Sequence, residues 1–84
     1  MFQVSPNPTC NQLNIILYSQ ENTKVDINIY NVLGQTIHIA QGVEVINGTN
    51  ELMMDISLLC TGYYMLEVMT ESGLYRAQKK LVKN

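Results

Sequence analysis

The chain has 84 residues, of which 46% are hydrophobic and 14% are charged, and its formal net charge is -2. This length allows one domain, residues 1–84, with a small core, and the hydrophobic content excludes a disordered chain. The charged fraction lies below the roughly 25% of ordinary domains, so we expect an unusually neutral surface.

No apolar run approaches the roughly 18 residues of a membrane span, so no span is expected. No basic region with an apolar stretch follows Met1, as it would in a signal peptide. We therefore expect either a cytosolic protein or a piece of a longer one.

The first segment with a restricted conformation is SPNPTC, at residues 5–10. Pro6 and Pro8 have a fixed φ and no backbone N–H, and Asn7, which precedes a proline, is pushed toward an extended conformation. The segment can therefore be neither a helix nor a central strand. An edge strand, a kink and an exposed recognition segment remain as alternatives.

Beyond this segment, apolar and polar residues alternate with a period of two, and turn signals recur at short intervals. This pattern predicts six or seven strands, at residues 2–5, 12–18, 23–31, 35–45, 50–56, 62–70 and 74–82. Helix has little support, and only residues 55–59 could form a short turn, capped by Asp55 or Ser57. The predicted fold is an all-β, immunoglobulin-like antiparallel β-sandwich of about seven strands.

The sixth predicted strand has two apolar faces. Tyr64, Leu66 and Val68 are expected to face the core, which leaves Tyr63, Met65, Glu67 and Met69 on the opposite face. We expect Met53, Met65 and Met69 to lie under a covering loop, and a surface for a partner is the alternative.

The charges are distributed unevenly along the chain. Residues 1–75 carry seven acids and one base, a net charge of -6, whereas residues 76–84 carry four bases. One interpretation of this basic end is a solvated edge strand. Nucleic acid is not an expected partner, because four bases on an acidic body make a small footprint and no aromatic ladder accompanies them.

The sequence contains no recognisable catalytic or metal-binding pattern. His38 lies between two isoleucines without Cys or Asp at ligand spacing, so we expect a solvent-facing strand histidine. A Gly-rich phosphate loop, a metal-ligand motif and a nucleophile elbow are absent, and calcium ligands are too few. We therefore expect no enzyme and no cofactor.

The two cysteines could form a disulfide. In a seven-stranded sandwich, the connections at residues 7–11 and 57–61 fall at the same pole, which makes a Cys10–Cys60 bridge geometrically feasible. The bridge would stabilise the fold by about 4 kcal/mol in loop entropy if it were unstrained. Two free thiols are the alternative, and alkylation of the native protein without reductant, followed by mass measurement, distinguishes them.

Four segments of the chain carry a resemblance to a known family. They are SPNPTCNQLNI at 5–15, VDINIYNVLGQTI at 25–37, NGTNELMMDISLLCTGYYMLEV at 47–68 and KKLVKN at 79–84. Together they resemble the type A C-terminal sorting domain of the type IX, or Por, secretion system of Bacteroidota. That family has a PNP opening, an I-Y-N-x-x-G-Q hairpin, an N-x-x-x-x-D-x-S-x-L-x-x-G-x-Y stretch and a short basic-apolar end, in this order.

Several matching residues also have structural explanations, since Gly34 and Gly62 would supply backbone freedom in turns and Tyr64 would fill the core. Two positions depart from the pattern: Ser5 stands where an aromatic or apolar residue often precedes PNP, and Cys60 where proline or alanine is common. The resemblance places the sorting motif on Pro6, Asn7, Pro8, Tyr30, Asn31, Gly34, Gln35, Asp55, Ser57, Leu59, Gly62, Tyr64, Lys79, Lys80, Leu81, Val82 and Lys83.

The resemblance implies a secretion address rather than a catalyst. Such domains stand at the C-terminus of a larger cargo protein, which reaches the periplasm by an N-terminal signal. The type IX outer-membrane machinery then exports the cargo to the cell surface or the medium. A sortase-like cysteine protease commonly removes the domain and often joins the cargo to an anionic lipopolysaccharide. Cleavage is expected at or upstream of residue 1, so the chain is expected to be a fragment of a larger secreted protein.

The basic end suggests how such an address could be read. A last strand with its lysines on one face, and with Leu81 and Val82 beside them, could add to the sheet of a partner.

Two other functions remain open. One is an immunoglobulin-like or fibronectin-type module that binds carbohydrate or protein through exposed aromatics, for which Tyr18, Tyr30, Tyr63 and Tyr75 are the candidates. The other is a spacer that stabilises a neighbouring domain. A homodimer or a swapped strand is a further alternative, because the surface is neutral and the sheet edges are unpaired.

Overall fold

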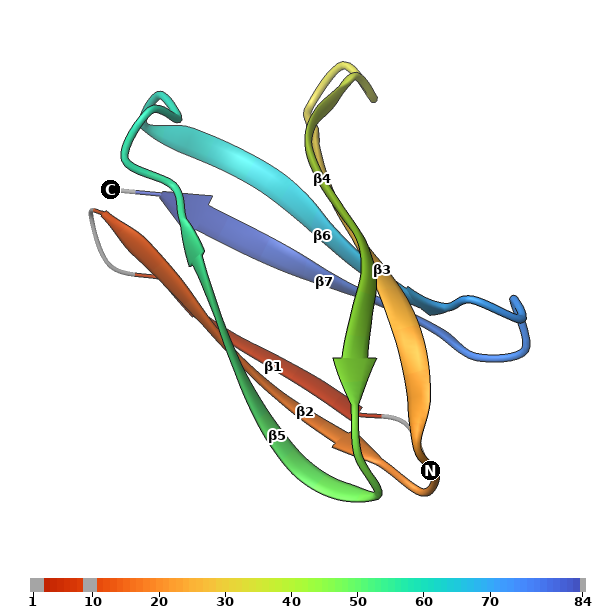
Figure 1. Cartoon of the computed structure of the whole chain (residues 1–84). Coiled ribbons are helices and arrows are strands. Elements are labelled where there is room, and N and C mark those ends of the chain that lie inside the picture. Colours follow the sequence, from red (N-terminus) through yellow and green to blue (C-terminus); the bar gives the residue numbers. More distant parts are fainter. Residues whose placement is uncertain (1–2, 9–10, 84) are drawn as a thin grey trace.

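The structure, a computed structural model, describes residues 3–8 and 11–83 and contains seven strands (Figure 1). The strands are β1 (Gln3–Pro8), β2 (Gln12–Ser19), β3 (Thr23–Asn31), β4 (Thr36–Val45), β5 (Gly48–Asp55), β6 (Gly62–Thr70) and β7 (Arg76–Lys83). Within the described residues there is no helix, and hence none that could cross a membrane. The prediction of an all-β chain with about seven strands is confirmed.

The strands form two antiparallel sheets that pack against each other. One sheet has the order β1-β2-β5 and the other the order β4-β3-β6-β7. The edge strands β1 and β7 lie beside each other across the two sheets, on one side of the sandwich (Figure 1). The connections β2–β3, β4–β5 and β5–β6 each cross from one sheet to the other. This is the predicted immunoglobulin-like sandwich, and β4 belongs to the sheet of β3, β6 and β7.

Alternate residues of the strands supply the core between the sheets, as a period of two requires. In β2, for example, Leu13, Ile15 and Leu17 are completely buried, while Ile16 between them is exposed. Leu66 and Val68 of β6 face the core as predicted, and Tyr64 packs against it half-buried. The buried apolar cluster consists of Val4, Leu13, Ile15, Leu17, Val25, Ile27, Ile29, Val45, Met54, Ile56, Leu66, Val68 and Leu81.

The prolines of the PNP segment lie inside edge strand β1, which extends further than the predicted strand at 2–5. In an antiparallel pair, only every second residue of a strand forms its backbone hydrogen bonds with a given neighbour. Because Ile56 N donates to Asn11 O, the odd-numbered residues of β2 form these bonds with β5. The even-numbered residues of β2 form theirs with β1. Pro6 and Pro8 are opposite the odd residues Ile15 and Leu13. Their nitrogens therefore point away from β2, where no donor is needed, and this explains how an edge strand accommodates both prolines.

The short turn predicted at residues 55–59 is present but is not helical. Leu59 N donates to Ile56 O at 3.0 Å, and the carboxylate of Asp55 accepts from Ser57 N at 2.9 Å. Asp55, rather than Ser57, is therefore the capping residue of this turn.

One other expectation is wrong, and a second holds only in part. Met53 and Met65 are exposed, on different sheets, so no described loop covers them. His38 was expected to face solvent, but it lies opposite buried Ile29 and is itself half-buried. The β3–β4 ladder shifts register next to this pair, between Ile29 and Tyr30, and a shift of this kind cannot be seen in the alternation of one strand.

Candidate functional site

The residues of the four sequence motifs gather at one end of the sandwich. Tyr64 on β6 lies opposite Asn31 on one side and Leu81 on the other, and Gln12, which starts β2, lies opposite Asp55. We call this end the motif pole and define it by residues 31–35 of the β3–β4 hairpin, residues 55–61 between β5 and β6, and the end of β7 from Lys80 to Lys83 (Figure 1). The backbone of Pro8 reaches the same end, opposite Leu13.

The hairpin of the motif pole is held by the side chain of Asn31. Its carbonyl oxygen accepts from the backbone N–H groups of Leu33 at 2.9 Å and Gln35 at 3.0 Å, and its amide donates to the side chain of Gln35 at 2.9 Å. Gly34 has a φ of 82°, a left-handed conformation that other residues rarely adopt. Asn31, Gly34 and Gln35 therefore build the turn, while Val32 and Leu33 project from it and are exposed.

The terminal lysine of the motif closes the turn between β5 and β6. Lys83 is only 7% exposed, and its ammonium group donates to the carbonyl oxygens of Leu59 at 2.6 Å and Ser57 at 3.4 Å. The hydroxyl of Tyr64 donates to the carbonyl of Cys60 in the same turn. The motif stretch at 55–64 and the basic end, which are distant in sequence, thus form one hydrogen-bonded unit.

The surroundings of the remaining residues of this stretch indicate a role in the fold. Leu59 is half-buried against the core, and Gly62 begins β6 with a φ of 155°. The carboxylate of Asp55 is ionised over a wider pH range than usual, because the hydrogen bonds from Ser57 lower its pKa.

The two faces of β7 have different surroundings. Leu81 and Lys83 point inward and are buried, whereas Lys80 and Val82 point outward and are exposed. Lys79 belongs to the inward row but is exposed. The expectation that the lysines share one face is wrong, because successive residues of a strand alternate between faces.

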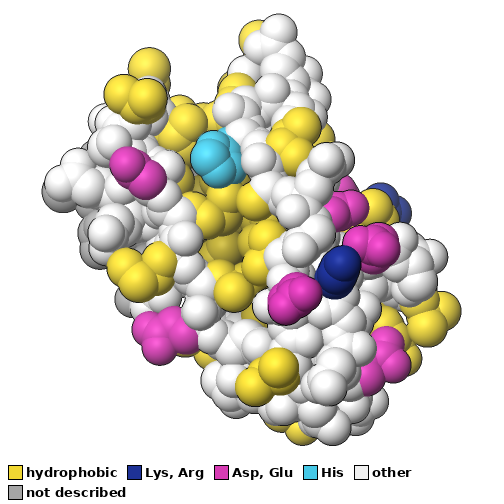
Figure 2. All heavy atoms as spheres, viewed as in Figure 1, with side chains coloured by type: hydrophobic (Ala, Val, Ile, Leu, Met, Phe, Trp, Pro, Cys, Tyr) yellow, Lys and Arg dark blue, Asp and Glu magenta, His cyan; other side chains and the backbone are white. Residues whose placement is uncertain are grey.

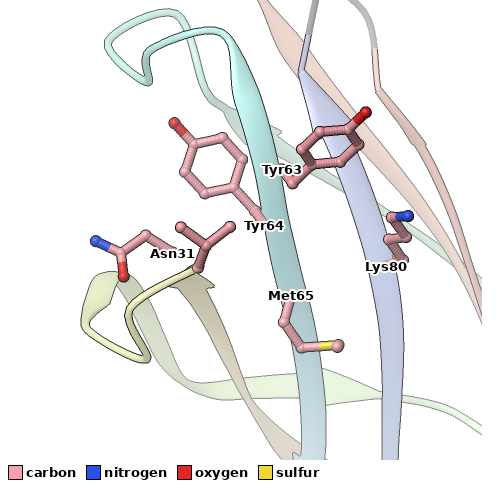
Figure 3. Close-up of a pocket in the computed structure, with 6 residues that line it drawn as sticks. Asn31, Tyr63, Tyr64, Met65 and Lys80 are labelled. Atoms are coloured by element: carbon pink, nitrogen blue, oxygen red, sulfur yellow. The ribbon is translucent and has the colours of Figure 1, made fainter.

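A shallow hollow lies on the outer face at the motif pole (Figure 3). It has a volume of about 310 Å³ and is lined by Asn31, Val32, Tyr63, Tyr64, Met65 and Lys80. The ammonium group of Lys80 is 4.9 Å from the centroid of the Tyr63 ring, a cation–π contact. Figure 3 shows Tyr63 and Lys80 beside each other over β6 and β7, with Tyr64 on the hairpin side of β6.

Glu67 is a buried acid that the sequence did not single out. It belongs to the outer face of β6 but is only 6% exposed, because long polar side chains of β3 and β7 surround it. Gln78 donates to it at 2.8 Å and Tyr30 at 3.1 Å, and Arg76 forms an ion pair at 3.6 Å. These contacts, the bond from Gln78 foremost, lower the pKa of Glu67, and burial with the bond to Glu67 raises the pKa of Tyr30. Only the strand register brings these groups together, so no local sequence signal could have identified them.

The structure bears on only one member of the proposed disulfide. Cys60 is exposed and forms no disulfide with any described residue, and Cys10 lies outside the described residues. The Cys10–Cys60 bridge therefore stays a prediction.

The chain matches a known protein family. The family described as the secretion system C-terminal sorting domain matches residues 3–84, which include all seven strands. No curated protein matches the chain.

Proposed function

The chain belongs to the family of secretion system C-terminal sorting domains, and on this premise we propose that it directs a larger cargo protein from the periplasm across the outer membrane by the type IX machinery. The observation that carries the proposal is the motif pole. Three sequence motifs that are separated along the chain form one end of the sandwich there, and the PNP motif reaches it at Pro8.

We propose that the outward row of β7 is the part of this end that the machinery reads. Thr70 N donates to Tyr75 O, so the odd-numbered residues of β7 form their backbone hydrogen bonds with β6. The even-numbered residues Gln78, Lys80 and Val82 therefore direct their backbone N–H and C=O groups away from β6. A strand of the machinery could pair with these groups and contact Lys80 and Val82 with its side chains.

The PNP segment contributes to this surface by leaving β7 unpaired. β1 and β7 are neighbours, and residues 3–5 of β1 line one hollow together with residues 77–79 of β7, yet the two strands belong to different sheets. Pro6 and Pro8 carry no N–H on the edge of β1 that faces away from β2. β1 therefore cannot extend a ladder to β7 along these residues, and the edge groups of β7 stay open to a partner.

A reporter fused in front of residues 1–84 tests the proposal. The wild-type fusion is expected outside the outer membrane of a bacterium that has the type IX system, and a fusion with Lys80→Glu and Val82→Ser is expected to accumulate in the periplasm. Lys79→Glu is the matched control, because it makes the same charge change on the other face of β7 and should leave export intact. Deleting residues 79–84 would be less informative, since it also removes buried Leu81 and Lys83.

Two outcomes contradict these proposals separately. Retention of the wild-type fusion in the periplasm would refute sorting. Full export of the Lys80/Val82 variant, with circular dichroism showing an intact fold, would refute the outward row of β7 as the contact.

We propose further that a sortase-like cysteine protease releases the cargo on the N-terminal side of β1, with surface anchoring to follow. β1 is paired with β2 from Gln3 onward, and a protease needs an extended, unpaired segment. The mass of the surface form of the cargo locates the cut, and a cut within β1 or beyond would contradict this proposal.

The aromatic residues give little support to a carbohydrate-binding module. Tyr18 lies on β2, Tyr63 on the other sheet and Tyr75 between β6 and β7, while the hydroxyl of Tyr30 is bonded to Glu67. These four rings therefore make no common platform for a sugar.

A further inference from the structure

The four edge strands of the sandwich differ in how well they are protected against pairing. β1 carries two prolines, β7 carries Arg76 and three lysines, and β4 has two register shifts with a left-handed Gly42. Prolines, lysines and bulges are the common means by which natural edges avoid further pairing. Along its whole length, Gly48–Asp55, β5 has no proline, lysine or bulge, and its ladder with β2 runs without a shift. Its only charged side chains are those of Glu51 and Asp55, which repel acidic strands but not basic ones.

The free edge of β5 presents a regular row of backbone groups. Because Ile56 N bonds to Asn11 O, even-numbered residues of β5 bond to β2. Thr49, Glu51, Met53 and Asp55 therefore direct their N–H and C=O groups outward, and all four residues are exposed. This is the arrangement that an added strand needs.

The same side of the sandwich is incompletely closed. With β1 beside β7, the three-stranded sheet has no described strand opposite β4, the fourth strand of the other sheet. Figure 2 shows a hollow between β5 and β4 with apolar side chains on its floor and the single histidine, in cyan, at its rim. Leu52 of β5 and Ala40 and Val43 of β4 pack only half-buried against the core there. Apolar side chains of an added strand would enter this hollow, because the pleat turns every second residue inward.

The charges on this side are of one sign. β4 and β5 carry three acids, Glu44, Glu51 and Asp55, and neither Lys nor Arg. Glu51 and Asp55 stand in the outward row of β5, beside the positions that the intervening residues of an added strand would occupy. Two bases of other strands act on these acids: Lys24 of β3 lies opposite Glu44, and Lys83 of β7 adds to the hydrogen bonds from Ser57 that lower the pKa of Asp55. Glu51 accepts a hydrogen bond from the side chain of Asn14 at 3.1 Å and has no basic partner across the ladder. Opposite charges across neighbouring strands are favourable, so this edge selects a basic strand.

We propose that β5 is a second docking edge, which binds an extended segment of a partner protein with apolar residues at alternate positions and Lys or Arg between them. The segment pairs with the outward backbone groups of β5 and fills the hollow between β5 and β4. The surface lies on the side of the sandwich away from β7, so a partner could occupy it while β7 is engaged.

Binding to synthetic peptides tests the proposal with the whole chain in solution. The probe is a peptide of alternating valine and lysine over about ten residues, a common strand length, and the control replaces lysine by glutamate. By isothermal titration calorimetry at low salt, the lysine peptide should bind at least about tenfold more tightly than the glutamate peptide, and added salt should weaken it.

Two variants separate backbone pairing from charge. Met53→Pro removes one outward N–H without removing a hydrogen bond to β2, and should lower the affinity for the lysine peptide about tenfold or more. Met53→Thr keeps the N–H and should bind the lysine peptide with the affinity of the wild type. If Met53→Pro fails to fold, Glu51→Lys serves instead. This charge reversal should lower the affinity for the lysine peptide and raise the affinity for the glutamate peptide.

Three results would overturn the proposal. They are equal binding of the two peptides, unchanged binding by both Met53→Pro and Glu51→Lys, and a wild-type dimer in sedimentation that Met53→Pro dissociates, which would assign the edge to a second copy. None of them bears on export of the reporter, so this test and that of the sorting function fail independently.

Discussion

The inward and outward rows of β7 are built from similar residues but have different tasks. Each contains lysine and one branched aliphatic residue, yet Leu81 and Lys83 are buried while Lys80 and Val82 are exposed. Half of the basic end thus stabilises the sandwich, and the other half is available to a partner. A basic segment can therefore not be interpreted as a recognition signal before its alternation relative to the core is known.

Truncating Leu81 should have the largest effect on stability. Leu81→Ala leaves a cavity between the sheets, since the side chain is 1% exposed, and should lower the free energy of unfolding by about 3 kcal/mol. Urea denaturation measures this, with Val82→Ala as the matched control on the opposite face, expected to cost about 0.5 kcal/mol. Equal losses for the two variants would show that β7 does not have a buried and a free face.

Removing the ammonium group of Lys83 should have the next largest effect. Lys83→Met keeps most of the apolar stem but leaves the carbonyls of Ser57 and Leu59 without their donor, which should cost about 1–3 kcal/mol. Lys79→Met makes the same change at an exposed position and should shift the urea midpoint little. Similar midpoints for the two variants would contradict the anchoring role of Lys83.

At the start of β7 the outward row is engaged by Glu67 of β6. The carboxylate of Glu67 accepts a hydrogen bond from Gln78 and forms an ion pair with Arg76. Glu67→Gln should cost about 1–2 kcal/mol at neutral pH, since charged hydrogen bonds are lost. The pKa of Glu67 is lowered in the folded state, so its contribution is complete above the ordinary value of 4.5 and is lost as the pH falls through the lowered pKa.

Urea midpoints measured over the acidic range test this dependence. The wild type should lose more stability on acidification than Glu67→Gln, and the variant should retain the smaller loss that comes from Asp55, whose pKa is also lowered. If the urea midpoints of the two proteins fell in parallel with pH, Glu67 would be excluded as the origin of the loss of stability in acid.

The smallest effect on stability is expected at Lys80. Lys80→Ala removes only the exposed contact with the Tyr63 ring and should change the free energy of unfolding by about 0.5 kcal/mol or less. The urea midpoint of Lys80→Ala is compared with that of Lys83→Met, and should lie closer to the wild-type midpoint. A loss as large as that of Lys83→Met would mean that the outward row also supports the fold.

Much of the fold could be predicted from local patterns. The alternation in β2, β3 and β6 reflects burial of one face, so the strands at 12–19, 23–31 and 62–70 were predicted with nearly correct bounds. The face of His38 was not predictable, because it depends on the register shift beside Ile29 in the β3–β4 ladder. The surroundings of Glu67 depend in the same way on strands β3 and β7, which are distant in sequence.

The sequence by itself determined the all-β class, the exclusion of the PNP segment from helices and central strands, and the family, because periodicity, proline chemistry and motif order are properties of the chain. Only the tertiary structure decided which lysines are buried, which carboxylate is enclosed and which sheet edge is left without protection. These depend on strand register and sheet order, and both are set by long-range pairing that no local pattern encodes.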